Sequence, residues 1–165
     1  MAKAETLTES MENYLETILA LEEDHKVARA KEIADKLKIQ RGSVTGGLKT
    51  LAEKGLINYE PYSYITLTPE GKKIAKEVAR RHAVLRDFLE GILRVDPKAA
   101  EENACRMEHA ISGAVLERLV CFIDYIHTCP RAGDQWIEAF VEYCRSDNFS
   151  ERKCETCIQD WKAAH

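Results

Sequence analysis

The chain has 165 residues, a formal net charge of −4, 45% hydrophobic and 32% charged residues, and six cysteines. This length fits one compact domain or two small ones, and the few glycines (8) and prolines (4) exclude a low-complexity or collagen-like chain. The sequence shows neither a bilayer-spanning apolar run nor a signal peptide. We therefore expect a cytoplasmic protein without membrane association, whose cysteines are thiols or metal ligands rather than a disulfide framework.

The first half of the chain predicts three helices followed by a hairpin. Apolar residues recur at the spacing of one helical face in three successive segments, which are residues 10–24, 30–37 and 43–54. Gly55 is expected to end the third helix. The period then changes to two short β-prone runs separated by a turn, which are residues 56–60 and 64–67.

The second half is predicted to be helical throughout. Thr68 and Pro69 suit the N-cap and first position of a long helix that continues to about Arg94. Three more helices are expected, over residues 97–110, from 113 through 123 to a break at Thr128, and over residues 134–144.

Helix, tight turn, helix and hairpin form the winged helix-turn-helix pattern. The fold class is therefore mainly α, with an N-terminal winged helix-turn-helix followed by a second helical domain. The expected boundaries are residues 1–72 for the winged helix-turn-helix, 73–128 for the second helical domain, and 129–165 for a Cys-rich helical tail.

Charge supports DNA binding by the first of these domains. Residues 26–54 contain eight basic and three acidic side chains, a local net charge of +5 inside an acidic chain. Small polar residues and glycines open the third helix, where they can reach base edges. The alternative is a merely solvated basic face. The candidate DNA-binding residues are Arg29, Lys31, Arg41, Gly42, Ser43, Thr45, Gly46 and Lys49.

Metal-ligating side chains recur in the remaining helices. Cys105, Glu108 and His109 stand at i, i+3 and i+4, so on one helix they face a common point. His82 occupies the apolar face of the long helix, either as a hydrogen-bonded core residue or as an inward ligand. Asn13 and Glu16, at i and i+3 on the first helix, belong either to a solvated face or to the same site.

Five segments together resemble the diphtheria-toxin repressor and manganese-transport regulator family, in its short form without the SH3-like domain. The resemblance covers about residues 7–125, and its most specific part is Cys-x-x-Glu-His behind a winged helix. The segments are Ser10–Glu16, Ser43–Thr45, Leu67–Lys72, Arg81–His82 and Glu102–Ser112.

The resemblance implies two neighbouring metal sites. One ion would be held by Asn13, Cys105, Glu108 and His109, and a second by Glu16, His82 and a bridging Glu108. The sequence departs from the family at Asn13, where the iron-sensing branch has methionine and the manganese-sensing branch aspartate. Because a thiolate suits Fe²⁺ or Co²⁺ better than Mn²⁺, Cys105 favours Fe²⁺ as the cofactor, with Mn²⁺ or Co²⁺ as alternatives.

The C-terminal cysteines form a separate candidate site. Cys154 and Cys157 have the Cys-x-x-Cys spacing that lets two thiolates bind one metal. Together with Cys129 and Cys144 they could hold a structural Zn²⁺ or an iron–sulfur cluster. The alternative is a set of free or redox-active thiols.

These observations predict a metal-dependent transcriptional repressor, with a DNA-binding domain over residues 1–72 and a helical dimerisation and metal-binding domain over residues 73–128. The resemblance implies that it represses metal-homeostasis genes. It would bind a palindromic operator in double-stranded DNA as a homodimer, formed through helices of about residues 96–125. The alternative is a winged-helix thiol-redox sensor that uses the Cys-rich tail. An enzyme is not expected, because Cys105 and His109 lack an orienting third group and an oxyanion hole.

Overall fold

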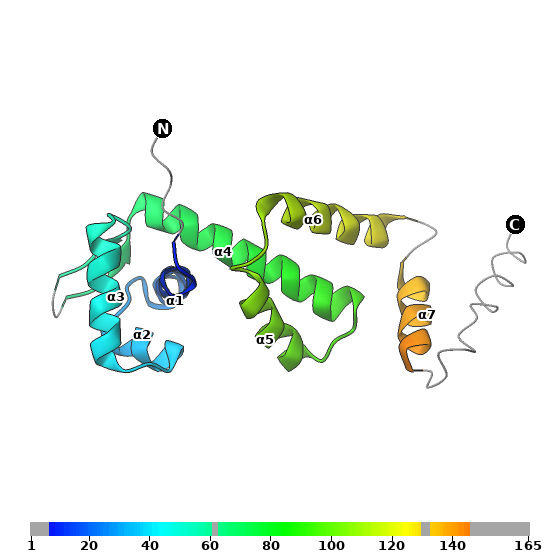
Figure 1. Cartoon of the computed structure of the whole chain (residues 1–165), viewed down its shortest axis with the longest axis horizontal. Helices are drawn as coiled ribbons and strands as arrows, with labels where there is room; N and C mark the ends of the chain where they lie inside the picture. Colours follow the sequence, from blue (N-terminus) through cyan, green and yellow to red (C-terminus); the bar gives the residue numbers. More distant parts are fainter. Residues whose placement is uncertain (1–6, 61–62, 130–132, 146–165) are drawn as a thin grey trace, which may run out of the picture. The chain divides into compact units, whose positions relative to one another are not determined.

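The computed structural model describes residues 7–60, 63–129 and 133–145, and it is mainly helical (Figure 1). The helices are α1 (Glu9–His25), α2 (Ala30–Leu37), α3 (Arg41–Glu53), α4 (Pro69–Asp87), α5 (Pro97–Met107), α6 (Gly113–Thr128) and α7 (Asp134–Arg145). Strands β1 (Ile57–Asn58) and β2 (Thr66–Leu67) form one antiparallel pair, with Ile57 opposite Leu67. The predicted mainly α fold class is confirmed.

Two compact units divide the described residues. The first contains the described residues up to Ala83 together with Cys105–Ala110, and the second contains Val84–Ala104 and the described residues from Ile111 onward. None of the described helices has a stretch long and apolar enough to cross a membrane.

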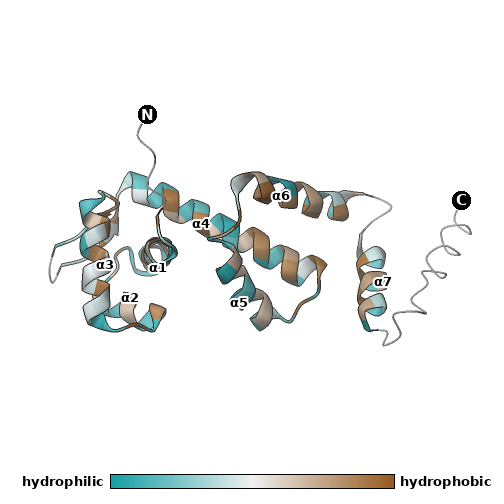
Figure 2. Cartoon of the chain, viewed as in Figure 1, coloured by the Kyte–Doolittle hydropathy of each residue, from teal (hydrophilic) through white to brown (hydrophobic). Residues whose placement is uncertain are grey.

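The core of the first unit is built on the apolar face of α1. Leu15 and Ile18 are fully buried there against side chains of α2 and α3, among them Ile33, Leu48 and Leu51. Each such aliphatic side chain contributes roughly 1.5–3 kcal/mol when it is removed from water. Hydrophobic and hydrophilic residues alternate around the helices in Figure 2, as amphipathic helices require.

The hairpin is shorter than the sequence predicts, because Ile65 pairs elsewhere. Its N–H and C=O exchange hydrogen bonds of 2.9 and 3.0 Å with Ala28, in the loop before α2. Next to it, the backbone N–H of Leu67 donates to the carboxylate of Glu22 on α1 at 2.6 Å. The hairpin, which is the wing of this fold, is therefore attached to α1.

The predicted ends of two helices are wrong. The α-helical part of α4 ends at Asp87, and a π-helical turn, η1 (Phe88–Ile92), follows it instead of an α-helix continuing to Arg94. Arg94 has a left-handed φ of 55°, which ends the helical path. The helix predicted to reach Ala110 ends at Met107, because the chain turns there and the N–H of Ala110 bonds to the C=O of Met107.

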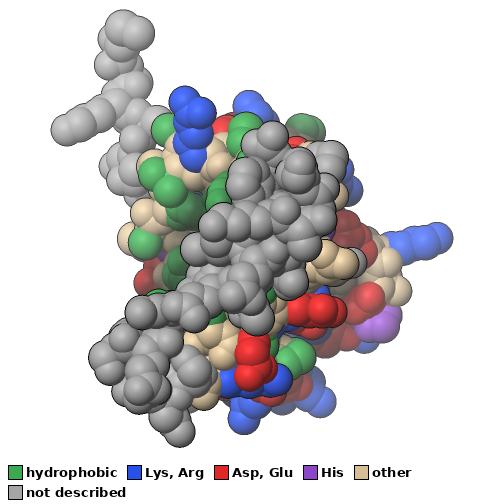
Figure 3. All heavy atoms as spheres, turned by 90° about the vertical axis from the view of Figure 1, so that its right-hand side faces the viewer, with side chains coloured by type: hydrophobic (Ala, Val, Ile, Leu, Met, Phe, Trp, Pro, Cys, Tyr) green, Lys and Arg blue, Asp and Glu red, His purple; other side chains and the backbone are tan. Residues whose placement is uncertain are grey.

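The second unit is held together by aliphatic contacts from η1, α6 and α7. Ile92, Ile123, Ile126 and Ile137 form a buried cluster. Other large apolar side chains of this unit reach the surface, and Figure 3 shows hydrophobic side chains exposed on the face that it presents. The exposed large apolar side chains of α6 are Val115, Phe122 and Tyr125.

Gly47, inside α3, is explained by Tyr14. A Cβ at residue 47 would lie 2.7 Å from a ring carbon of Tyr14, which is buried on α1, whereas a Cβ at Gly46 would meet nothing within 4 Å. The hydroxyl of Tyr14 also donates to the C=O of Ser43 at 3.3 Å. Close packing of α1 on α3 therefore requires a glycine at residue 47.

We expect Gly47→Ala and Gly46→Ala to change stability in opposite directions. Overpacking against the buried Tyr14 ring should lower the free energy of unfolding by about 1–3 kcal/mol in Gly47→Ala. Gly46→Ala should raise it by roughly 0.5–1 kcal/mol, because alanine loses less conformational entropy in a helix. Urea unfolding in the presence of a chelator measures both, and equal stability of the two variants would contradict this explanation.

Candidate metal centre

Three segments of the first unit bring the candidate ligands together. Asn13 and Glu16 lie on α1, His82 lies on α4, and Glu108 and His109 lie in the turn that follows α5. The end of α5 at Met107 creates this turn, so the prediction that Cys105, Glu108 and His109 share one helix is wrong.

Glu108 is the most deeply buried of these residues. It is fully buried, and its Oε2 lies 2.6 Å from Nδ1 of His82. In the part of the chain that the structure describes, one group of three His, Cys, Asp or Glu residues has ligand atoms within 4.8 Å of one another, and it consists of Glu16, His82 and Glu108. These are the residues that the family resemblance implies for one ion.

The other oxygen of Glu108 faces a second set of atoms. Nε2 of His109 lies 3.2 Å from Glu108 Oε1 and 2.9 Å from Asn13 Oδ1. Neighbouring ligand atoms of an ion with bonds of about 2.1 Å at right angles are about 3 Å apart. The two carboxylate oxygens of Glu108 are therefore divided between two groups of potential ligands.

The surroundings of Glu108 fit a cation. Oε1 is buried and makes no hydrogen bond to any described residue. Burial, and then the nearby carboxylate of Glu16, raise the pKa of Glu108 to about 7, although His82 and His109 act in the opposite direction. A buried carboxylate with an unused lone pair and a second carboxylate beside it is stabilised by a bound cation.

Cys105 lies outside the group of three residues. It is exposed on α5, and its sulfur is not among the ligand atoms that lie within 4.8 Å of one another. The donors that the structure brings together are thus oxygen and nitrogen atoms. Such donors suit Mn²⁺ as well as Fe²⁺.

Sequence reasoning missed Glu12 and Arg81 as neighbours of this centre. Oε2 of Glu12 lies 2.7 Å from Nδ1 of His109, and Oε1 lies 3.7 Å from Nη1 of Arg81. The available signal was the spacing of Glu12 and Glu16, which at i and i+4 share one face of α1.

The predicted DNA-binding residues gather at a cavity of about 900 Å³ on the first unit. It is lined by Arg29, Lys31, Arg41, Thr45 and Lys49 from α2, α3 and the residue before α2, together with Tyr59, Ser63 and Tyr64 from the hairpin region. The guanidinium of Arg29 stacks 5.2 Å from the ring centre of Tyr64. Gly42, Ser43 and Gly46 are exposed near the start of α3 but do not line the cavity.

The predicted cysteine site is described only in part. Cys129 is half-buried after α6 and Cys144 is exposed on α7. Cys154 and Cys157 lie outside the described residues. Neither Cys129 nor Cys144 joins a group of three potential ligands within the described ranges.

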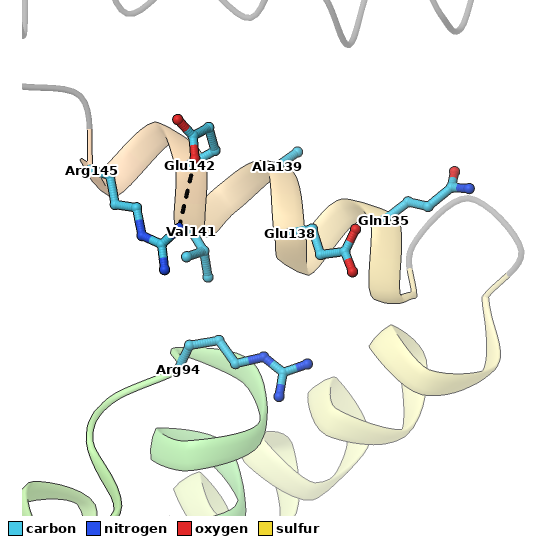
Figure 4. Close-up of a pocket in the computed structure, with 7 residues that line it drawn as sticks. All are labelled: Arg94, Gln135, Glu138, Ala139, Val141, Glu142 and Arg145. Atoms are coloured by element: carbon cyan, nitrogen blue, oxygen red, sulfur yellow. Dashed lines mark ion pairs between the residues drawn. The ribbon is translucent and has the colours of Figure 1, made fainter.

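A further cavity, of about 910 Å³, lies in the second unit between Arg94 and α7 (Figure 4). The charged side chains that line it are exposed, and Glu142 pairs with Arg145 at 3.9 Å. It contains no His or Cys, and its mixed charges offer no converging ligand set.

Two family models match most of the chain. Residues 6–65 match the N-terminal DNA-binding domain of iron-dependent repressors, and residues 68–137 match their metal-binding and dimerisation domain. The residues of the candidate metal centre fall within these two matched segments.

Individual proteins agree with the family models. The chain is 40% identical over 119 residues to an uncharacterised HTH-type transcriptional regulator of Methanocaldococcus jannaschii, covering 72% of this chain and 95% of that protein. It is 34% identical over 125 residues to the regulator MntR of Listeria monocytogenes, covering 76% and 87%. The structure of the manganese regulator SloR matches with a TM-score of 0.64 and 29% identity, over 76% of this chain and 58% of that one. The chain therefore spans little more than half of the length of that solved structure.

We expect Glu108 to make the stability of the metal-free protein depend on pH. Its carboxyl titrates near 4.5 ordinarily and near 7 in the folded protein, so between these values the folded state binds more protons than the unfolded chain. The contribution of Glu108 to the free energy of unfolding is fully present below its pKa in the unfolded chain. It is lost as pH rises through its pKa in the folded protein, at up to about 1.4 kcal/mol per pH unit.

Comparison with Glu108→Gln isolates this contribution from those of Glu16, His82 and His109. In urea unfolding with a chelator present, the stability of the wild type relative to the variant should decline from about pH 4.5 to about pH 7 and then level off. Parallel curves for the two proteins over that range would show that the pKa of Glu108 is not raised.

Proposed function

The chain belongs to the iron-dependent repressor family, which includes diphtheria toxin repressor and MntR, and on this premise we propose that it represses transcription by binding DNA when a divalent metal ion is bound. The observation that carries the proposal is the division of the two Glu108 oxygens between two groups of potential ligands. Since the matched relatives are transcriptional regulators, the expectation that the chain is not an enzyme agrees with them.

The described residues support two neighbouring ions. Glu16, His82 and Oε2 of Glu108 would hold one of them. Asn13, His109 and Oε1 of Glu108 would hold the other, with the amide oxygen of Asn13 in place of a carboxylate. When bound, such ions supply the positive charge that allows Glu16 and Glu108 to remain ionised side by side.

Helix α1 couples this centre to both DNA-facing elements. Tyr14, between the ligands Asn13 and Glu16, packs on Gly47 and bonds to the C=O of Ser43 in α3. At the other end of α1, Glu22 accepts from Leu67 of the wing at 2.6 Å. Ligands that fix α1 therefore fix α3 and the wing with it, and a metal that binds this arrangement better than others shifts the population toward it.

The basic cavity is the proposed phosphate contact. Arg29, Lys31, Arg41 and Lys49 carry the charge, while Gly42, Ser43, Thr45 and Gly46 lie at the exposed start of α3, where small side chains let the backbone approach base edges. The match of residues 6–65 to the family's N-terminal DNA-binding domain supports this proposal.

A homodimer on a palindromic operator completes the proposal. Val115, Phe122 and Tyr125 are 57, 42 and 58% exposed on α6, within the segment that matches the dimerisation domain. Residues 115 and 122 are seven apart, so they share one face of the helix. A second copy packed on this face would remove the exposed apolar surface from water and place two α3 helices for two half-sites.

Fe²⁺ is the ion that we propose, and this choice depends on Cys105. If the thiolate of Cys105 joins the oxygen and nitrogen donors, the site favours Fe²⁺ over Mn²⁺. Without it, the donors are those that Mn²⁺ accepts equally well.

We expect metal to control DNA binding by the full-length chain. A duplex selected from random-sequence DNA in the presence of Mn²⁺ should bind about 5–150-fold more tightly to the Mn²⁺-loaded protein than to the metal-stripped protein. His82→Ala should lose this gain, because it removes a ligand of the group with Glu16 and Glu108. His127→Ala is the matched control, since His127 is exposed on α6. Equal affinity of stripped and loaded protein would contradict metal control.

We expect Co²⁺, as an air-stable substitute for Fe²⁺, to report whether Cys105 is a ligand. With Cys154→Ser and Cys157→Ser present in every protein compared, so that the Cys-x-x-Cys pair cannot bind Co²⁺, a sulfur-to-cobalt charge-transfer absorption should appear in the otherwise wild-type chain and in Cys144→Ser, and should be absent in Cys105→Ser. Loss of the thiolate should also weaken Co²⁺ binding by about tenfold or more, and Mn²⁺ binding by less. Identical spectra of the wild type and Cys105→Ser would remove the reason to prefer Fe²⁺ to Mn²⁺.

A further inference from the structure

Glu12 lies on α1 one helical turn before Glu16, and it contacts His109 instead of solvent. Its side chain is 15% exposed and that of His109 is 7% exposed, with 2.7 Å between Oε2 and Nδ1. Neither the ligand set that the family resemblance implies nor the group formed by Glu16, His82 and Glu108 includes Glu12. Its carboxylate therefore needs an explanation of its own.

The contact decides which nitrogen of His109 carries the proton. A carboxylate only accepts hydrogen bonds, so at 2.7 Å Nδ1 must be the donor. When the ring is neutral, Nε2 on its opposite side has its lone pair directed toward Asn13 Oδ1 and Glu108 Oε1. Three acceptor atoms that face one another in this way bind a cation and repel one another without it.

Arg81 holds Glu12 in this position. Its Nη1 lies 3.7 Å from Oε1 of Glu12 and donates to the backbone C=O of Glu108 at 3.4 Å. Arg81 comes from α4, Glu12 from α1 and Glu108 from the turn after α5. The same three segments supply the potential ligands, so these contacts align the segments before any ion is present.

We infer that Glu12 is a positioning residue of the metal centre, which fixes His109 as the Nδ1–H tautomer so that Nε2 is available to a divalent cation. This inference rests on the proposed metal-dependent function. A carboxylate behind a ligating histidine orients its ring and increases the basicity of the nitrogen that binds the metal. The oxygen that faces Nδ1 points away from Nε2, so Glu12 acts through His109 and is not itself a ligand of that ion.

The test uses the full-length chain stripped of metal, with ¹⁵N-labelled histidine. In the wild type the ring ¹⁵N shifts of His109 should show a protonated Nδ1. In Glu12→Ala the proton should move to Nε2, and Mn²⁺ affinity measured by calorimetry should fall about 10–100-fold. Glu12→Gln should keep the Nδ1–H tautomer of His109, because the amide oxygen of glutamine still accepts a hydrogen bond. Its Mn²⁺ affinity should fall only about two- to fivefold.

Glu9→Ala is the matched control, because Glu9 is an exposed carboxylate on the same helix. It removes one negative charge near the site and should leave both the tautomer and Mn²⁺ affinity unchanged. The inference is overturned if Glu12→Ala binds Mn²⁺ as Glu9→Ala does, if its affinity falls without a change of tautomer, or if Glu12→Gln loses as much as Glu12→Ala. A wild-type chain that binds no Mn²⁺ contradicts the proposed function instead, and the ¹⁵N shifts then still decide the role of Glu12.

Discussion

The buried carboxylate of Glu108 is the constraint on which the centre depends. An ionised carboxylate in a protein interior is costly unless charge or hydrogen bonds compensate it. One oxygen of Glu108 meets His82, and the other is buried with no hydrogen bond from the described residues. The group therefore either takes up a proton, as its pKa of about 7 indicates, or takes a cation. Protons and metal ions compete for the same oxygen, and this competition links the site to pH.

Helix α1 contributes to both the core and the metal centre, because the helical repeat places apolar residues on one face and potential ligands on another. Leu15 and Ile18 are buried among α2 and α3, while Asn13 and Glu16, three residues apart, share another face of the helix. Asn13, Glu16 and the Tyr14 side chain that contacts α3 lie on the same turn of α1. A shift in the position of these potential ligands therefore also shifts the contact with α3. The coupling that we propose between metal and DNA would therefore pass through adjacent turns of α1.

Much of the fold and part of the site follow from the sequence. The three N-terminal helices follow from apolar spacing, and the α4 N-terminus from Thr68, whose hydroxyl accepts from the N–H of Gly71. The roles of Gly47 and Glu12 could not be predicted, since each depends on a residue distant in sequence: the Tyr14 ring for Gly47 and His109 for Glu12. The end of α5 was missed for a similar reason, because tertiary burial of Glu108 outweighs a helical spacing that local propensity would extend.

The net charge of −4 conceals an uneven distribution of acidic and basic residues along the chain. Three glutamates of α1 each connect the helix to a different segment. Glu12 contacts the turn after α5 through His109, Glu16 joins the group with His82 of α4, and Glu22 accepts from the wing. Three of the six acidic residues of α1 are therefore used in internal contacts, while basic residues of α2 and α3 line the surface cavity that we propose contacts phosphate. A mildly acidic chain can thus keep a basic surface on α2 and α3, because its acidic residues lie elsewhere and one of them, Glu22, attaches the wing to α1.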